Sequence, residues 1–78
     1  MRKTFNDAIV EFKVNSTIER VDRTIKTIKE VAYIVGISDD VIEDFDKEFK
    51  LLVNTADASD EWFNKMEALK ASILETLK

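Results

Sequence analysis

The chain has 78 residues and a formal net charge of −4, with 36% charged and 45% hydrophobic residues. This balance is typical of a folded chain of one domain, residues 1–78, and excludes a disordered one. The absence of cysteine excludes disulfides, and the absence of cysteine and histidine excludes a structural zinc site. With no proline and a single glycine, few residues interrupt a helix, so the sequence predicts an all-α fold.

The first residues do not read as a targeting signal. Two basic side chains stand near the start, but no apolar segment follows them. No apolar run approaches the length of a membrane span, so we expect a cytoplasmic protein with no membrane contact. Because a core of this size supplies only about 3–5 kcal/mol of net stability, a homodimer is one way to add support.

The first predicted helix covers about residues 4–13. Its apolar residues recur at helical spacing: Phe5, Ala8, Ile9 and Phe12. Thr4, followed by Asp7, resembles an N-terminal cap. Residues 10–14 also alternate as a strand does, and a strand that pairs with its copy in a dimer is the alternative. A strand without a partner would leave an exposed edge, which favours the helix.

A turn or kink is predicted at residues 15–17. Ser16 followed by Glu19 is a capping-box pattern. Phe12 and Ile18 are six positions apart, so they lie about 240° apart around a continuous helix. Because the apolar stripe does not carry across, we expect the chain to change direction here.

The clearest pattern covers residues 17–35. Its apolar residues are separated by three and four positions, as in the seam of a coiled coil: Ile18, Val21, Ile25, Ile28, Ala32 and Val35. Gly36 follows, where a left-handed residue would end the helix. If this seam packs against its own copy, the chain would be a homo-oligomeric structural module, which is one alternative for its function.

Two more helices are predicted, at about residues 39–54 and 59–77. Ser38 and Ser59 are the expected N-caps, and each precedes two acidic residues that suit the positive end of a helix dipole. The expected core residues are Val41, Ile42, Phe45, Phe49, Leu52 and Val53, then Trp62, Phe63, Met66, Leu69, Ile73, Leu74 and Leu77. The sequence thus predicts a small bundle of three main helices with a short N-terminal helix.

Negative charge is concentrated in the helix predicted at residues 39–54. Residues 39–50 hold six acidic and two basic side chains. Such a run is commonly a solvated face, but a focused patch also steers association with an oppositely charged partner. The candidate partner-binding residues are Asp39, Asp40, Glu43, Asp44 and Lys47. They favour a protein partner with a basic surface.

Tyr33 and Trp62 are the candidate interface aromatics, because large amphipathic rings are enriched at protein interfaces. Tyr33 lies at the edge of the apolar seam, and we expect it to be partly buried with its hydroxyl in water. Trp62 begins the last predicted helix, where we expect partial burial at the end of the bundle.

The stretch around Gly36 resembles the bacterial helix-turn-helix pattern over about 18 residues. The matching positions are Val31, Ala32, Gly36, Ile37, Ser38, Ile42 and Phe45. The resemblance implies a DNA-binding transcription regulator as a second alternative. However, the recognition helix would lead with Asp39 and Asp40 into a polyanion and offers no base-reading side chain there. Nucleic acid is therefore a disfavoured partner.

No catalytic, cofactor-binding or metal-binding residue is predicted. The commonest general base and thiol nucleophile are missing, and there is no glycine-rich phosphate loop. Asp40, Glu43 and Asp44 do not form the alternating loop of a calcium site. We therefore expect a non-enzymatic protein that binds another macromolecule as a regulator, inhibitor or assembly factor.

Overall fold

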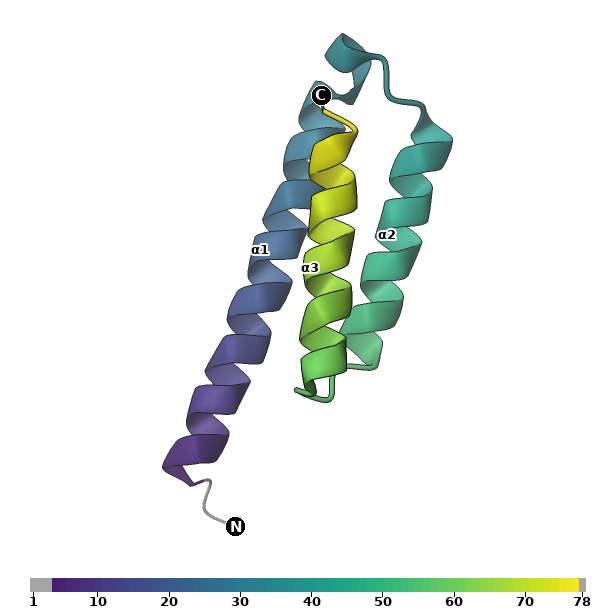
Figure 1. The fold of residues 1–78 in the computed structure, drawn as a ribbon. Coiled ribbons are helices and arrows are strands. Elements are labelled where there is room, and N and C mark those ends of the chain that lie inside the picture. Colours follow the sequence, from purple (N-terminus) through teal and green to yellow (C-terminus); the bar gives the residue numbers. More distant parts are fainter. Residues whose placement is uncertain (1–3, 78) are drawn as a thin grey trace.

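The computed structural model describes residues 4–77. They form three α-helices, α1 (Phe5–Val35), α2 (Asp39–Asn54) and α3 (Asp60–Glu75). Each helix packs against the other two, and α2 runs back alongside α1 before α3 returns between them (Figure 1). Since residues 4–77 contain no strand, the predicted all-α bundle is confirmed and the strand alternative for residues 10–14 is wrong.

α1 is one continuous helix of 31 residues, so the predicted short N-terminal helix and the break at residues 15–17 are wrong. The cap at its start is as expected: the Asp7 N–H donates to Thr4 Oγ1 at 3.1 Å, and the Thr4 N–H donates to Asp7 Oδ2 at 3.3 Å. No proline or glycine interrupts the helix at residues 15–17. The Thr17 hydroxyl there donates to the Lys13 carbonyl at 2.8 Å, which leaves the helix intact.

The change of apolar phase after Phe12 is present, but it does not end the helix. The prediction of a turn assumed that all the apolar residues near the N-terminus face one core. Instead, Phe5 is 80% exposed and Phe12 is 72% exposed, because this end of α1 extends past the ends of α2 and α3 (Figure 1). A helix end without neighbours has no side that it must bury, so its apolar phase does not fix its path.

The seam predicted in residues 17–35 forms the α1 side of the core. Val21, Ile25, Ile28 and Ala32 are buried. They pack against α2 and α3 of the same chain. The seam is thus covered within the single chain. Val35, the last residue of the pattern, is 48% exposed at the end of the bundle.

The turn from α1 to α2 is set by Gly36. Its φ of +79° is left-handed, and both its N–H and that of Ile37 donate to the Ala32 carbonyl. Ile37 then packs on the core, as is common after a glycine cap. α2 begins directly after Ser38, as predicted, but the Ser38 hydroxyl makes no capping hydrogen bond. The start of α2 thus depends on the turn and on its two acidic first residues rather than on a serine cap.

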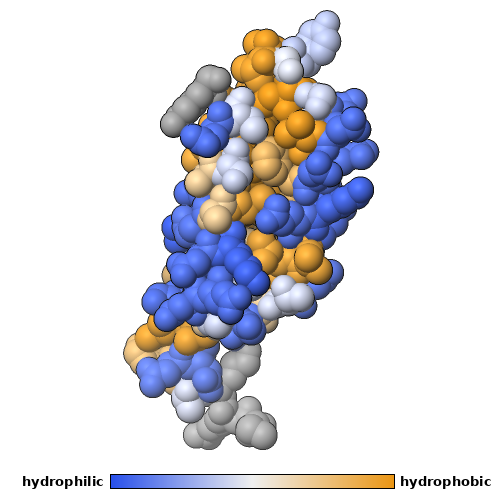
Figure 2. Space-filling view, turned by 45° about the vertical axis from the view of Figure 1, so that its right-hand side comes forward, coloured by the Kyte–Doolittle hydropathy of each residue, from blue (hydrophilic) through white to orange (hydrophobic). Residues whose placement is uncertain are grey.

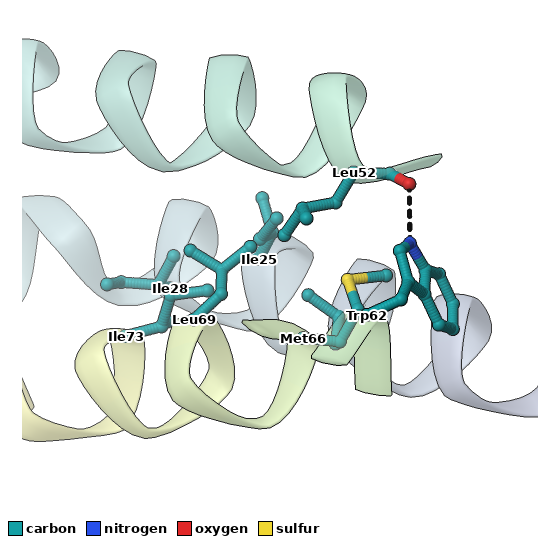
Figure 3. Close-up of a cluster of buried hydrophobic side chains, with 8 residues drawn as sticks. Ile25, Ile28, Leu52, Trp62, Met66, Leu69 and Ile73 are labelled. Carbon is teal, nitrogen blue, oxygen red and sulfur yellow. Dashed lines mark hydrogen bonds between the residues drawn. The ribbon is translucent and has the colours of Figure 1, made fainter. Parts of the chain in front are cut away.

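α2 and α3 supply the other two sides of the core. On α2, Ile42 and Leu52 are buried and Phe45 and Phe49 are partly buried, whereas Val41 lies at the surface. On α3, Trp62, Met66, Leu69 and Ile73 are buried as predicted, whereas Leu74, also expected in the core, is 45% exposed. Figure 3 shows α1, α2 and α3 contributing side chains to this one cluster.

Trp62 ties the end of α2 to the start of α3. Its ring is only 3% exposed, and the indole Nε1–H donates to the Leu52 carbonyl at 2.7 Å (Figure 3). The Ser59 hydroxyl caps α3 by accepting from the Trp62 backbone N–H at 3.1 Å, as predicted. Phe63 packs edge-on to the indole, with ring centroids 5.0 Å apart. The buried indole thus places the loop of residues 55–59 relative to both helices.

Replacing Gly36 tests the left-handed cap. No atom lies within 4 Å of the position that a Cβ would occupy, so alanine adds backbone strain and no clash. We expect Gly36→Ala to lower the free energy of unfolding by about 1 kcal/mol, and Gly36→Asn to cost less because asparagine tolerates this conformation. Urea denaturation measures both values. Equal losses for the two variants would argue against a left-handed cap.

Replacing Trp62 tests the buried hydrogen bond. Trp62→Phe removes the donor to the Leu52 carbonyl and part of the ring, and we expect a loss of about 2 kcal/mol in the free energy of unfolding. Tyr33→Phe is the control, since it removes a polar group from an exposed ring and should change stability by less than about 0.5 kcal/mol. Denaturation followed by circular dichroism gives both numbers. Similar unfolding midpoints for the two variants would contradict the role of this bond.

Candidate functional site

The candidate site lies on the first turns of α2. Asp39, Asp40, Glu43 and Asp44 are all exposed there, with Lys47 on the next turn. The helix brings them together because residues three and four apart are neighbours on its surface. Asp39 and Asp40 also face the positive end of the helix dipole, which helps to accommodate their charge. The structure therefore places all five predicted residues on one solvent-facing part of α2.

None of these five side chains has an ion-pair partner within residues 4–77, a property that they share with other charged residues such as Glu48 and Glu67. Several acids elsewhere are paired. Asp46, also on α2, forms ion pairs with Lys29 of α1 at 3.6 Å and with Lys50 at 3.3 Å. Further ion pairs join Glu19 to Arg23, Asp22 to Lys26 and Glu61 to Lys65. The charge of the α2 face is thus not neutralised by neighbouring side chains.

A groove between α1 and α2 adjoins this face. It has a volume of about 500 Å³ and is lined by Lys29, Ala32, Tyr33, Ile37, Asp39, Ile42 and Glu43. Its apolar lining comes from the packed ends of the two helices, and two of the candidate acids, Asp39 and Glu43, lie on its rim. Sequence reasoning assigned Ala32, Ile37 and Ile42 to packing alone. Their position on either side of the α1–α2 turn was the sequence feature that could have indicated the groove.

Tyr33 is 97% exposed, so the expected partial burial is wrong. It projects from the last turn of α1, beside the groove, on the side that α2 and α3 do not cover. Its neighbour Ile34 is 81% exposed. Figure 2 shows hydrophobic residues gathered at this end of the bundle, with a band of hydrophilic residues below them.

Trp62, the other candidate aromatic, lies in the core at the opposite end of α2, so its expected partial burial is also wrong. With 3% of its surface exposed, its ring contacts residues of its own chain and offers almost no area to a partner. Its contribution is therefore to the fold. Of the two aromatic candidates, only Tyr33 is placed where another molecule could contact it.

The loop before α3 holds the one carboxyl group, among residues 4–77, whose pKa clearly departs from its ordinary value. Asp57 Oδ1 accepts from the Ser59 hydroxyl at 2.7 Å and from the Ser59 N–H at 3.0 Å. These hydrogen bonds, the hydroxyl first, lower the pKa of Asp57 because they favour its charged form. The interaction holds the loop and is far along the chain from the acidic face.

The helix-turn-helix resemblance does not extend to the arrangement of the helices. Helix-turn-helix units cross at roughly 90–120°. Here α2 runs back alongside α1 (Figure 1). Over residues 4–77, no three histidine, cysteine, aspartate or glutamate side chains are placed to hold a metal ion. Within the same residues, no helix combines the length and apolar character needed to cross a bilayer.

A comparison with protein-family models, one with curated proteins and one with solved structures each found no match.

The low pKa of Asp57 predicts a dependence of stability on pH. A carboxyl whose pKa is lowered on folding adds stability above its unfolded value, near 3.9, and loses it as the pH falls through the folded value. We therefore expect Asp57→Asn to lower the melting temperature at pH 7, and this difference from the wild type to vanish at the most acidic pH.

An NMR titration of the Asp57 carboxyl checks the cause directly. Ser59→Ala removes the main hydrogen bond, so the pKa of Asp57 should rise toward its ordinary value in that variant. A wild-type pKa at or above the ordinary aspartate value would refute the assignment.

Proposed function

We propose that this chain is a small, non-enzymatic cytoplasmic protein that binds another protein through the acidic face of α2. It would act as a regulator, inhibitor or assembly factor. The partner surface is basic. The single observation that carries this proposal is the exposed cluster of Asp39, Asp40, Glu43 and Asp44, which has no ion pairs within residues 4–77. The absence of cysteine is compatible with the reducing compartment.

Unpaired acids on one helix face have a cost that a partner would remove. Like charges three and four residues apart repel each other on an isolated helix. The lysines of α2 relieve this only in part, since Lys50 pairs with Asp46 and Lys47 has no ion pair among the described residues. A basic partner surface would neutralise the repulsion and be attracted from a distance. The arrangement supports fast, salt-sensitive association.

The adjoining groove supplies an apolar contact for the same partner. Its lining includes Ile37 and the exposed ring of Tyr33, and Asp39 and Glu43 stand on its rim. A partner segment with an apolar side chain flanked by lysine or arginine would fill the groove and meet both carboxylates. Charge contacts alone give modest affinity at a protein rim, so this apolar contact is the expected source of stability for the complex.

The DNA-binding alternative has less support. Its recognition helix would be α2, whose exposed first turns carry only acidic charge. Binding to nucleic acid needs a basic footprint that displaces counterions. The basic residues of α1 nearest to the turn do not supply it, because Lys26 and Lys29 already pair with Asp22 and Asp46.

Charge reversal on α2 tests the proposed function. We expect Asp40→Lys/Asp44→Lys to weaken binding to the natural partner at least about tenfold, corresponding to about 1.4 kcal/mol, with unchanged helicity. The partner is captured from lysate of the source cells with the wild-type chain, and its affinity for each variant is then measured by calorimetry. Wild-type affinity should also fall as salt rises.

Glu67→Lys/Glu75→Lys is the matched control. It makes the same change in net charge with two exposed acids of α3, away from the α2 face. Its binding should stay close to that of the wild type. An equal loss in both double variants would show that only total charge matters, and no loss in the α2 variant would refute the proposed face.

A further inference from the structure

The most exposed large hydrophobic residues of the described chain share one helix. Tyr33, Ile34, Phe5 and Phe12 are 97%, 81%, 80% and 72% exposed, and all four belong to α1. The next in order, Leu51 on α2, is 63% exposed. Two of the four lie near the N-terminal end of α1 and two near its C-terminal end. Figure 2 shows hydrophobic residues toward both ends of the face in view, and a further group in its middle among hydrophilic residues.

Phe5 and Ile34 lie on the side of α1 that faces away from the bundle, whereas Phe12 and Tyr33 lie at its edges, where they also line grooves shared with α3 and α2. A row of positions separated by four and three residues runs along that side: Phe5, Ile9, Phe12, Ser16, Glu19, Arg23, Lys26, Glu30 and Tyr33. At 100° per residue, Arg23 of this row lies about 200° around the helix from Val21 of the buried seam. α1 therefore carries two rows with coiled-coil spacing, and only one of them is covered within the chain.

The molecule also exposes more surface than a compact monomer of its size. Its accessible area is 5931 Å², whereas the scaling for monomeric proteins gives about 4,900 Å² at 9.0 kDa. The excess of about 1,000 Å² is comparable to the roughly 800 Å² that each partner buries in a stable interface. Much of it comes from the length of α1, since the molecule measures 49 × 19 × 16 Å.

We infer that the outward row of α1 packs antiparallel against the same row of a second copy of this chain. An antiparallel arrangement with two-fold symmetry brings the apolar N-terminal end of one α1 onto the apolar C-terminal end of the other. Ile9 faces the partner's Tyr33, and Ala8 lies beside the partner's Ile34. Ile9 and Ala8 thus cover the partner's Tyr33 and Ile34, twice per dimer, while Phe5 lies at the end of the partner's α1.

The charges in the middle of the row fit the same register. With Ile9 opposite the partner's Tyr33, Glu19 stands opposite the partner's Arg23, and the symmetry repeats this contact. In the single chain these two side chains are more than 70% exposed and pair with each other at 3.4 Å. A shift of one heptad in one direction would instead place Phe12 opposite the partner's Arg23 and Ile9 opposite the partner's Lys26. The proposed register keeps Ile9 opposite the partner's Tyr33 and Glu19 opposite the partner's Arg23, and it places Phe12 opposite the partner's Glu30.

Solution mass over a concentration series tests the dimer. The wild type should pass from monomer to dimer, and Ile34→Lys should raise the dissociation constant at least about tenfold. Leu51→Lys is the matched control, because it makes the same substitution at an exposed site on another helix. A wild type that stays monomeric at every concentration would overturn the inference, as would equal weakening by both substitutions.

Charge exchange tests the register. Glu19→Arg should weaken the dimer, because it places two arginines opposite each other at both symmetric contacts. The double variant Glu19→Arg/Arg23→Glu should restore it, since the opposite charges face each other again. Circular dichroism of each variant checks that the helix is intact. Failure of the double variant to recover relative to the single one would exclude the proposed register.

Crosslinking tests the orientation. Because the chain has no native cysteine, only the introduced thiols can react. Chains with Ile9→Cys are mixed with chains carrying Tyr33→Cys and treated with a short thiol crosslinker. The two sites are about 36 Å apart along one α1, so a link between them must join two chains. We expect the mixed product to dominate. Self-links of Ile9→Cys chains alone at the same yield would show a parallel pairing and overturn the inference.

Discussion

α1 has 31 residues, whereas α2 and α3 have 16 each. At 1.5 Å per residue, α1 is about 46 Å long and its two neighbours are about 24 Å long. Two helices of that length cannot cover all of α1, and they cover only one of its sides. This difference in length decides which apolar residues are buried: Val21 and Ile28 face α2 and α3, whereas Phe5 and Phe12 face solvent. The exposed apolar residues at the two ends of α1 follow from this difference in length.

The short helices are held at one end by a few specific contacts. The Trp62 indole bonds to the last turn of α2, while its backbone N–H is capped by Ser59, which in turn is held by Asp57. At the other end, Gly36 reverses the chain and Ile37 packs on the core. With so few residues in the core, these polar contacts at the two turns define how α2 and α3 meet α1.

Most of the fold could be predicted because it depends on local patterns. The spacing of Val21, Ile25 and Ile28, the glycine at position 36 and the serine at position 59 act within a few residues, and they are where the patterns place them. The break at residues 15–17 was predicted wrongly because burial depends on which helices lie nearby. A change of apolar phase looks the same whether a helix ends or whether it leaves the bundle.

The candidate site, like the fold, was predictable where it depends on local patterns in the sequence. The acids of α2 cluster in sequence, so a helix necessarily brings Asp40 and Asp44 onto neighbouring turns. Tyr33 was misplaced because partial burial was inferred from its sequence neighbours, although its side faces away from the other helices. The groove beside it depends on the packing of two helix ends, and no spacing within one helix encodes that.

The two proposed contacts share Tyr33 but otherwise use different helices and different physical forces. The dimer contact lies on α1, in which five acidic and five basic residues balance between positions 5 and 35. The partner contact lies on α2, where the acids prevail. Pairing through α1 would leave both acidic faces open, so a dimer would present two of them and could bind a partner with repeated basic sites by avidity. Salt screens the charged α2 contact far more than the apolar ends of α1. The two associations can therefore be separated by ionic strength.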